Sequence, residues 1–593
     1  MNNLKIAKIF YMIAEYLEME EDPFRPQAYK KAAFTLENME EDVGEIYKRE
    51  GTKGLKKIPG VGEGIASKIV EYLKVGKVKY YEKLKKKAPV DVEELTAVEG
   101  MGPKRIKILY KELGIRNIKD LEKAVKLHKI APLFGFGEKT ERNILEGIEF
   151  LKKSKGRFLL GEILPAAKEI YEKLKNLKEV KKITIVGSLR RMKETIGDID
   201  FLITVKGSKK SALAKASANK IMDFFVSLPD IVKLWGKGPT KSSVRMRQGF
   251  DVDIRVIPAE SYGAALQYFT GSKEHNIITR KIAIAKGLKL NEYGLFRGSK
   301  MLAGKNEEKI YEILGMQWIP PELREDRGEI EAALKGKLPV LIEKKDIRGD
   351  LHCHSNWDGG EHSILEMAKK AMEMHYDYLG ISDHTKFLRI ENGLNEKQLS
   401  QQRKEIDELN SKFKINPTGS RRRQQNSKFR ILQGAETNIL KSGLIDINDT
   451  ALKKLDYAIA GIHSNFKMTK AKMTERIIRA MKNPNINIIS HPTGRLLKRR
   501  EEYQIDFDKI LRAAKEFNVV LEINSFPLRL DLNDQHIRRC KEAGVKMVIN
   551  TDSHHKNQMR YIELGVAQAR RGWAEKKDII NTQSIDKLLK YFK

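Results

Sequence analysis

The sequence predicts a multidomain α/β protein whose first part is all-helical and whose later parts combine strands with helices. Residues 1–150 carry apolar side chains at helical spacing and almost no alternating β-branched residues. Residues 151–320 mix helical segments with strands of period two, and the chain beyond Gly349 shows seven β-rich runs, most of them separated by helical segments. With 593 residues, the chain is long enough for about three to five domains of roughly 150 residues each.

Composition and charge limit the kind of protein further. The formal net charge is +33 and the basic residues are spread along the chain, which favours a polyanionic partner, although a generally basic proteome would also explain it. No apolar run approaches the ~20 residues of a membrane span, and the N-terminus lacks the apolar segment of a signal peptide. Cys353 and Cys540 are too few for a disulfide framework. We therefore expect no membrane association and a cytoplasmic, nucleoid-associated protein.

Two segments of the helical part repeat one design. Residues 57–73 (KIPGVGEGIASKIVEYL) and 97–113 (AVEGMGPKRIKILYKEL) place a Gly-x-Gly turn before a basic helix, and residues 134–145 are a degenerate third copy. A single Gly-x-Gly is usually a helix cap, but the two copies resemble helix-hairpin-helix motifs, in which backbone amides contact DNA phosphates. The candidate DNA contacts are Gly60, Gly62, Gly64, Lys68, Gly100, Gly102 and Lys104.

A turn rich in small and basic residues follows the expected strand at 181–186. The run GSLRRMKETIGDID begins with Gly187 and Ser188, whose backbone amides can approach a phosphate, and Arg190 and Arg191 add positive charge. This turn predicts a cradle for the phosphates of a nucleotide.

Three aspartates lie close behind this cradle in the predicted sheet. Asp198 and Asp200 are two residues apart on one strand, so both carboxylates point to one face and can share a divalent ion. Asp253, in the neighbouring strand FDVDIRVIP, supplies a third carboxylate. An Asp-x-Asp pair alone can be a solvated strand edge, but the complete pattern predicts a nucleotidyltransferase site for two-metal phosphoryl transfer.

Six motifs of the first 320 residues resemble, in order, those of family X DNA polymerases such as DNA polymerase beta. They are QAYKKAA (27–33), the PGVG hairpin, GS-x-RR with GDID, VDIRVIP (252–258), YFTGS (268–272) and LNEY (290–293). The resemblance implies a palm domain with a small nucleotide-selection subdomain. It also implies that Asp198, Asp200 and Asp253 bind two Mg²⁺ or Mn²⁺ ions, with deoxynucleoside triphosphates as substrates.

The same resemblance assigns residues to the nucleotide and to DNA. It implies triphosphate contacts from Gly187, Ser188, Arg191 and Arg157, a sugar-checking turn at Tyr268, Phe269 and Gly271, a base-edge contact from Asn276 and a template contact from Arg280. Tyr268 and Phe269 can alternatively be core aromatics. Lys68 matches a Schiff-base lysine found in some members, although a phosphate-binding or solvated lysine explains it equally well. Other positions of that lyase pocket differ here, as Arg25, Gly64 and Tyr80.

The seven β-rich runs of the C-terminal part end in metal-ligand residues. An array of parallel strands and helices predicts a barrel, and such barrels assemble their active sites at the carboxyl ends of the strands. These ends carry His352, His354, His384, Glu436, His463, His491, Asp552 and His554. Imidazole with carboxylate favours Zn²⁺, Mn²⁺ or Fe²⁺ over Mg²⁺ alone.

This pattern resembles the PHP (polymerase and histidinol phosphatase) domain, in which up to three metals serve phosphoester hydrolysis. The resemblance implies a (β/α)7-like barrel, two or three Zn²⁺ or Mn²⁺ ions and a phosphate contact from Arg495. Where the family motif has aspartate, this chain has Gly359, so Asp358 is the expected ninth ligand, with Glu361 or His362 as alternatives. The basic segment at residues 414–428 is expected to be a surface loop.

The expected domains are a helix-hairpin-helix region at 1–150, a nucleotidyltransferase palm at 151–258, a nucleotide-selection subdomain at 259–320, a linker at 321–346 and a PHP domain at 347–593. The resemblance implies a monomeric gap-filling repair polymerase, acting in base excision repair on gapped, nicked or primer-template DNA. Its PHP domain would act as a 3′-5′ exonuclease, abasic-site endonuclease or 3′-end phosphoesterase. Two alternatives stay open: a noncatalytic, metal-stabilised PHP scaffold, and a nucleotidyltransferase acting on RNA or a small molecule.

Overall fold

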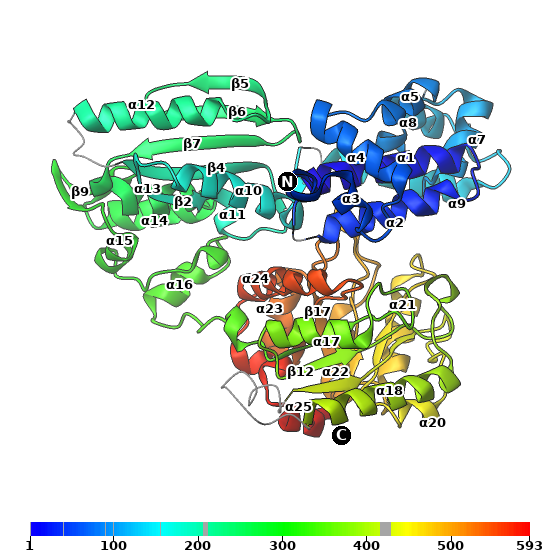
Figure 1. Cartoon of the computed structure of the whole chain (residues 1–593). Helices are drawn as coiled ribbons and strands as arrows, with labels where there is room; N and C mark the ends of the chain where they lie inside the picture. Colours follow the sequence, from blue (N-terminus) through cyan, green and yellow to red (C-terminus); the bar gives the residue numbers. More distant parts are fainter. Residues whose placement is uncertain are drawn as a thin grey trace. The chain divides into compact units, whose positions relative to one another are not determined.

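The computed structural model describes residues 2–39, 41–88, 90–98, 100–153, 156–205, 212–414 and 429–592 (Figure 1). Residues 415–428, most of the expected surface loop, lie outside the described residues. The chain divides into two compact units, one of Met1–Lys155 with Leu496–Glu501 and one of Gly156–Arg495 with Glu502–Lys593. Among the described residues, no helix is both long and apolar enough to cross a membrane.

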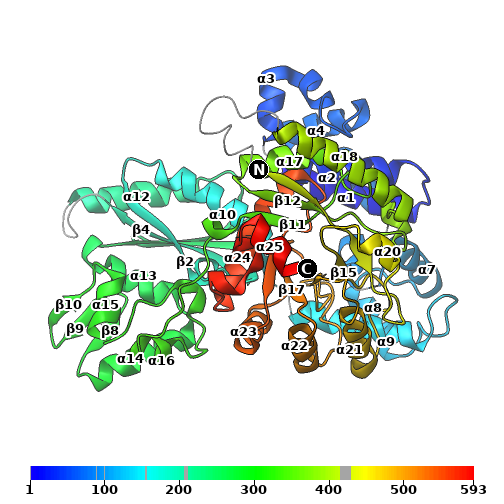
Figure 2. The same cartoon turned by 90° about the horizontal axis from the view of Figure 1, so that it is seen from below.

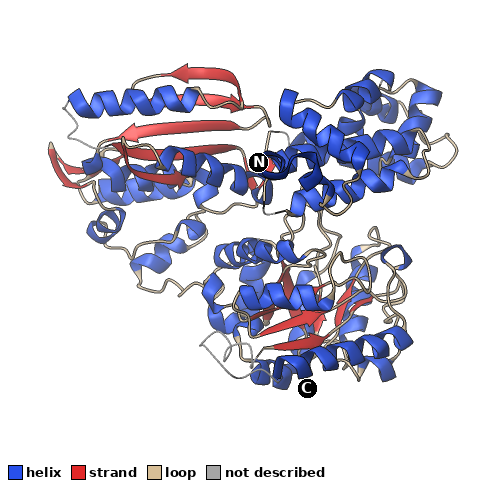
Figure 3. Ribbon diagram, in the orientation of Figure 1, coloured by secondary structure: helices blue, strands red, loops and turns tan. Residues whose placement is uncertain are grey.

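The first unit contains nine helices and no strand among its described residues (Figure 3). Ile58, Val61, Ala66 and Ile69 are buried in its core, which explains the helical spacing of the apolar residues. The helices are α1 (Asn2–Met19), α2 (Arg25–Asn38), α3 (Val43–Lys56), α4 (Glu63–Val75), α5 (Lys79–Lys87), α6 (Val92–Thr96), α7 (Pro103–Leu113), α8 (Ile118–Lys126) and α9 (Glu138–Lys153).

A five-stranded mixed sheet forms the centre of residues 156–257. Its strand order is β2-β4-β7-β6-β5, and helices α10 and α12 pack against it. Strand β4 pairs antiparallel with β2 and parallel with β7. The elements are β1 (Phe158–Leu159), α10 (Leu160–Lys175), β2 (Val180–Val186), α11 (Gly187–Arg190), β3 (Thr195–Ile196), β4 (Asp198–Val205), α12 (Ala212–Val226), β5 (Ile231–Lys237), β6 (Lys241–Met246) and β7 (Asp251–Ile257).

Residues 259–346 add a small helical subdomain with a three-stranded sheet. The expected linker differs from what the structure shows, because Ile330 and Ala333 are buried in the same apolar cluster as Leu314 and Ile319. The elements are η1 (Ala259–Ser261), α13 (Tyr262–Thr270), α14 (Lys273–Ala285), β8 (Lys289–Asn291), β9 (Gly294–Arg297), β10 (Lys300–Ala303), α15 (Glu307–Ile313), η2 (Pro321–Leu323), α16 (Glu329–Leu334) and η3 (Lys344–Asp346).

The C-terminal part is a parallel barrel-like array with helices outside its strands (Figure 2). Two parallel sheets, β11-β12-β13 and β14 to β18, are joined by bridges between His384 and Glu436 and between Cys353 and Ser553. The strands are β11 (Gly349–Cys353), β12 (Tyr378–Ile381), β13 (Arg430–Gln433), β14 (Glu436–Asn438), β15 (Ile459–Gly461), β16 (Ile488–Ile489), β17 (Val520–Asn524) and β18 (Met547–Asn550). The expected third run is therefore two strands, broken at Gly434-Ala435.

Buried side chains from successive strands fill this array. One cluster takes one residue from each of seven strands, as inward-pointing layers of such barrels do: Leu351, Tyr378, Leu432, Ile459, Ile488, Val520 and Val548. The surrounding helices are α17 (Ile364–Glu373), α18 (Glu396–Lys414), α20 (Asp449–Leu452), α21 (Lys470–Met481), α22 (Phe507–Glu516), α23 (Asp534–Ala543), α24 (Ile562–Arg571) and α25 (Ile585–Phe592). The predicted multidomain α/β class is confirmed.

Candidate functional site

The three predicted aspartates lie on one face of two adjacent strands. Asp198 and Asp200 are two positions apart on β4, and the parallel register places Asp200 beside Asp253 of β7. The intervening Ile199 and Val252 are fully buried, so the strand period turns the acids away from the core. The structure thus brings together the three residues that the sequence proposed as one site.

Burial and neighbouring groups act differently on the three carboxylates. Asp253 accepts a hydrogen bond from Ser243 at 2.5 Å and pairs with Lys241 at 2.9 Å. Burial, with the charges of Asp198 and Asp253, raises the pKa of the Asp200 carboxyl to about 7, and burial also raises the pKa of Asp198. Among the described residues, the close metal-ligand groups all lie in the barrel instead.

Gly187 makes room for the aspartate site. Its φ is +68°, which favours glycine, and a Cβ here would overlap the Asp200 carboxylate. Ser188 is half-buried on the short helix α11. Arg157 donates to Thr195 Oγ1 at 2.9 Å and lies close enough to lower the Asp198 pKa against the larger effect of burial. The structure therefore places Gly187 and Arg157 at the aspartates.

The two arginines of the turn are engaged by acids far away in sequence. Arg190 bonds Glu307 through both terminal nitrogens, at 3.1 and 2.9 Å, so it does not join the cradle that the sequence predicted. Arg191 pairs with Glu325 at 2.9 Å and also donates to the Thr270 carbonyl. Both contacts join residues more than a hundred positions apart, so local sequence patterns could not reveal them.

The expected nucleotide-selection residues form a connected group. Tyr268 and Phe269 meet edge to face at 5.1 Å, and Gly271, at φ +70°, lies against Arg191. Asn276 is buried; it donates to the Tyr268 carbonyl at 2.7 Å and accepts from Gln267 at 2.9 Å. Arg280 follows one turn later and donates to the Asn276 carbonyl at 3.1 Å. These hydrogen bonds fix Asn276 before any ligand binds.

The glycine turns of the helical unit have the geometry expected of phosphate-contacting hairpins. Gly60 and Gly100 have φ of +77° and +81°, whereas Gly62 and Gly102 directly precede helices α4 and α7. A Cβ at Gly62, Gly64 or Gly102 would meet nothing within 4 Å, so backbone amides there are open to a ligand. Lys104 is exposed on α7.

Lys68 lies over two tyrosine rings of the same unit. Its Nζ is 5.8 Å from the Tyr29 ring centre and 5.1 Å from that of Tyr80, and it donates to the Gly64 carbonyl at 2.9 Å. Burial lowers the pKa of Lys68, with a smaller effect from Arg25. A lowered pKa favours the neutral amine that a Schiff base requires.

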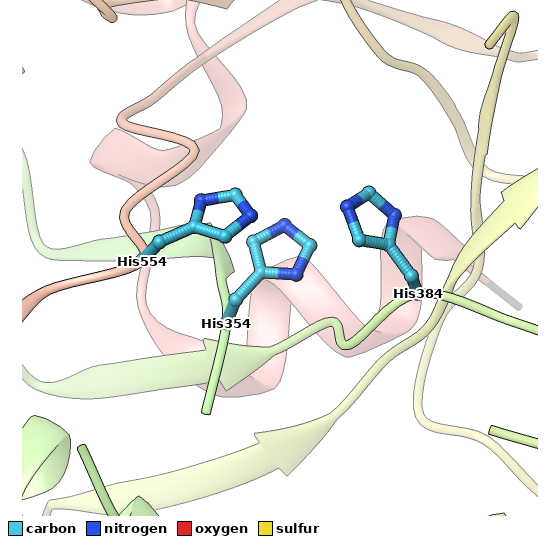
Figure 4. A group of neighbouring side chains, drawn as sticks. All are labelled: His354, His384 and His554. Atoms are coloured by element: carbon cyan, nitrogen blue, oxygen red, sulfur yellow. The ribbon is translucent and has the colours of Figure 1, made fainter. Parts of the chain in front are cut away.

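The barrel brings eight predicted ligands into one largely buried cluster. His354 lies between His384 and His554 (Figure 4). Its ring centre is 4.4 Å from that of His384 and 4.0 Å from that of His554. Glu436 is the central acid, at 2.9 Å from His384 and His491 and 3.3 Å from His352 and His463. The close groups are His352, His354, Glu436 and Asp552; His384, Glu436 and His463; and His354, His384 and His554.

Second partners orient these imidazoles from behind. His352 Nδ1 lies 2.7 Å from Glu522, His354 Nδ1 2.7 Å from Asp358, and His463 Nδ1 3.1 Å from Asn438. Holding one ring nitrogen fixes the tautomer and turns the other toward the centre, which is how histidines that bind metals are supported.

Six buried nitrogen and oxygen atoms of this cluster make no hydrogen bond of normal geometry among the described residues, although some of them lie at ion-pair distance from one another. They are His352 Nε2, His354 Nε2, His384 Nδ1, His463 Nε2, His491 Nδ1 and Glu436 Oε2. Burial raises the pKa of Glu436, but His352, His463 and His384 outweigh it and hold that pKa well below its usual value. Buried polar atoms without partners are costly, so this donor set fits divalent cations that accept imidazole and carboxylate ligands.

Asp358 lies behind the cluster and orients its ligands. It accepts from the backbone of His384 at 2.8 Å as well as contacting His354, and it forms a further close group with His354 and Asp383. The alternatives Glu361 and His362 lie instead near His555, whose ring centre is 4.4 Å from that of His362.

Sequence reasoning missed several residues of this region. Asp383 accepts from Ser355, and Glu522 holds His352. Glu522 is a buried acid inside the otherwise apolar run of β17, and Asp383 directly precedes the predicted ligand His384, so both carried an available signal. Arg529 lies 3.5 Å from Asp552. The predicted phosphate contact, Arg495, is buried and instead pairs with Glu194 at 2.8 Å and donates to the Leu530 carbonyl.

Family models match four segments of the chain. The DNA polymerase beta thumb matches residues 265–325, the DNA polymerase beta palm 161–230, a helix-hairpin-helix domain 1–78 and a SAM-like helix-hairpin-helix tandem 92–149. These matches agree with the helical unit, the mixed sheet and the subdomain described above.

Similarity to curated proteins extends over the whole chain. DNA polymerase/3′-5′ exonuclease PolX of Bacillus subtilis (strain 168) is 36% identical over 590 residues, covering 99% of this chain and 98% of that protein. A probable phosphatase of Acetivibrio thermocellus is 35% identical over 133 residues, 21% of this chain and 53% of that protein. A probable phosphatase of Clostridium acetobutylicum is 38% identical over 133 residues, 21% of this chain and 52% of that protein.

Proposed function

The chain belongs to the family X DNA polymerases of the PolX type, and on this premise we propose that it fills gaps in damaged DNA and trims 3′ ends at two separate metal centres. The observation that carries the proposal is the presence of both centres, the aspartates of β4 and β7 and the buried imidazole cluster, in one chain. Base excision repair is the pathway that such a pair of activities serves.

The polymerase centre would hold two Mg²⁺ or Mn²⁺ ions on Asp198, Asp200 and Asp253. Such ions lower the pKa of the primer 3′ hydroxyl and neutralise the charge that develops on the triphosphate. Gly187 and Ser188 would offer backbone amides to the triphosphate, and Arg157 would add charge. Arg191 would reach it by exchanging Glu325 for a phosphate oxygen.

The deoxynucleotide itself would be selected by the group around Gly271. Tyr268 and Phe269 form the surface against the sugar, and Asn276, fixed by its bonds to Gln267 and to the Tyr268 carbonyl, faces the base edge. Arg280 contacts the template.

The barrel centre would hold two or three Zn²⁺ or Mn²⁺ ions. The ligands would be His352, His354, His384, Glu436, His463, His491, Asp552 and His554. The chemistry that such metals would supply there is the activation of water for attack on a phosphodiester. Glu522 and Asp358 hold the imidazoles of His352 and His354 in place. Glu436 belongs to two of the close groups and so connects them. The reaction we propose for this centre is exonuclease cleavage at a 3′ end. Cleavage at an abasic site, by the same hydrolysis of a phosphodiester, is a second proposed reaction.

DNA would be gripped without sequence preference by the glycine turns at Gly60–Gly64 and Gly100–Gly102, with Lys68 and Lys104 close by. Amide-to-phosphate contacts position a duplex but do not read its bases. The protein would act as a monomer.

The test uses a gapped duplex labelled on the primer, with Mg²⁺ or Mn²⁺, with and without deoxynucleotides. We expect Asp200→Ala to lose extension by more than about 1,000-fold and to keep trimming, and His354→Ala to do the reverse. Metal content and unfolding temperature of each variant serve as controls. Trimming that survives in a clean His354→Ala protein, or never appears in the wild type, would make the barrel a scaffold. Extension of an RNA primer alone would select a different nucleotidyltransferase.

A further inference from the structure

We propose that Arg529 is the phosphate-binding residue of the barrel centre, an inference that rests on the phosphodiesterase activity proposed above. The residue lies in the segment between β17 and α23, just beyond the strand that carries Glu522. Its Nε is 3.5 Å from Asp552 Oδ2, and its side chain is 20% exposed. Because Asp552 belongs to the close group with His352 and His354, the guanidinium lies at the edge of the metal ligands.

The hydrogen-bond donors of Arg529 are free for a substrate. Among the described residues, none accepts a hydrogen bond from its guanidinium, which makes only the 3.5 Å ion pair. Arg571, by contrast, bonds the Arg191 carbonyl, Glu325 and Asp534. A guanidinium offers five N–H donors in a planar fork that matches two oxygens of a phosphate. Arg529 therefore has the chemistry of an anion receptor.

Metal binding would release Arg529 from its one acidic neighbour. Asp552 is 9% exposed and supplies ligand atoms to the cluster, so its negative charge would be shared with the bound cations. The arginine, which is 20% exposed, would then have no competing carboxylate among the described residues. A phosphodiester oxygen is the anion that the proposed reaction brings to this position.

Several hydrogen bonds hold the backbone that carries Arg529. Asp531 accepts hydrogen bonds from the Thr493 amide at 3.0 Å, the Thr493 hydroxyl at 2.9 Å and the Gly494 amide at 2.8 Å. The Leu530 carbonyl accepts from Arg495. A receptor fixed before binding loses little entropy when the ligand arrives. Arg495 is thus a positioning residue for Arg529, and does not itself contact the phosphate.

The experiment measures binding of inorganic phosphate to the full-length, Mn²⁺-loaded protein by calorimetry. All variants carry Asp200→Ala, so that the polymerase centre contributes less to the heat. We expect Arg529→Ala to bind phosphate about 10- to 100-fold more weakly, the effect of losing one charge-assisted hydrogen-bond pair. Arg529→Lys recovers part of the affinity, because a lysine keeps the charge but not the fork. Arg512→Ala, at an exposed position of helix α22, is the matched control and binds as the parent does.

Two further measurements make the outcome decisive. Bound Mn²⁺ is counted in each variant, and the KM and kcat for release of a 3′ nucleotide are compared in protein with an intact Asp200. Unchanged phosphate affinity in a fully metallated Arg529→Ala protein overturns the proposal. Loss of metal from that variant overturns it too, because Arg529 would then support Asp552 only. If phosphate binding depends on Arg529 but the protein hydrolyses no phosphodiester, the proposed role of Arg529 stands and the proposed phosphodiesterase activity is refuted.

Discussion

The two candidate metal centres of this chain are built in opposite ways. The aspartates of β4 and β7 are carboxylates only, partly exposed, and one of them is already paired with Lys241. The barrel cluster is largely buried, mixes imidazole with carboxylate, and contains six buried nitrogen and oxygen atoms without a hydrogen bond among the described residues. The first is suited to ions that arrive with a triphosphate, and the second to ions that stay with the protein.

One glycine in each centre allows the sharpest test of this comparison. Gly187 lies against Asp200, and a Cβ at Gly461 would be 2.9 Å from Glu436 Oε1 and 2.6 Å from Ser490 Oγ. We expect Gly187→Ala to slow extension by about 100-fold with trimming intact, and Gly461→Ala to slow trimming by about 100-fold with extension intact. Primer extension and 3′ trimming measured on the same preparations check both.

The control for these two variants is a glycine replacement that is expected to have no effect. Gly236 lies on the exposed strand β5 without a positive φ, and a Cβ there would meet nothing within 4 Å. Gly236→Ala should leave both activities as they are. If Gly187→Ala and Gly461→Ala each reduce both activities, the centres are not independent and the comparison fails.

Removal of tightly held metal should destabilise the barrel and spare the mixed sheet. An ion whose dissociation constant is about 100 to 1,000 times below its free concentration contributes about 3–4 kcal/mol to stability, so chelation should lower the unfolding temperature of the barrel by roughly 6–16 °C. Protection of β11–β18 amides from hydrogen exchange, with and without chelator, locates the effect. Equal loss of protection in β4 and β7 would show that the aspartates also hold a resident ion.

Lys241 should compete with a cation at the polymerase centre. Its ammonium lies 2.9 Å from Asp253 Oδ2, where a divalent ion would sit. We expect Lys241→Ala to lower the Mg²⁺ concentration for half-maximal extension by about 2- to 5-fold, because this half-exposed pair is weak. Lys237→Ala, whose partner is Asp223, is the control. A higher Mg²⁺ requirement in Lys241→Ala would give Lys241 a role in binding rather than in competition.

The smallest expected effect is a pH dependence of metal-free stability. Burial raises the pKa of Asp200 from 3.8 to about 7, so its protonated form stabilises the fold below about pH 4, and this contribution is lost as pH rises through 7. In chelator, Asp200→Asn should melt close to the wild type at pH 4 and about 2–4 °C above it at pH 8. A difference that does not change with pH would contradict the raised pKa.

Local sequence patterns predicted the parts of both centres that depend on spacing. Period two placed Asp198 and Asp200 on one face, and the rule that parallel strands end at one edge gathered His352, His384 and Asp552. These residues were found because neighbours in the chain determine where they point.

Contacts between distant segments could not be predicted in the same way. From the sequence, Arg190 and Arg191 were interpreted as one basic pair. In the structure they pair with two different acids, Glu307 and Glu325, each more than a hundred residues later in the chain. Arg495, for which the sequence suggested a phosphate contact, likewise pairs with Glu194, which lies 301 positions earlier in the chain. Charge alone did not reveal which partner each side chain meets.

The ion pair between Arg495 and Glu194 also limits how the two halves could be exchanged between proteins. A chimera that keeps this barrel but replaces residues 156–320 would remove Glu194 from a buried guanidinium, whose other described acceptor is the Leu530 carbonyl. An unmatched buried charge costs several kcal/mol, commonly about 3–5. A working hybrid must therefore bring its own acid to that position or carry a neutral residue in place of Arg495.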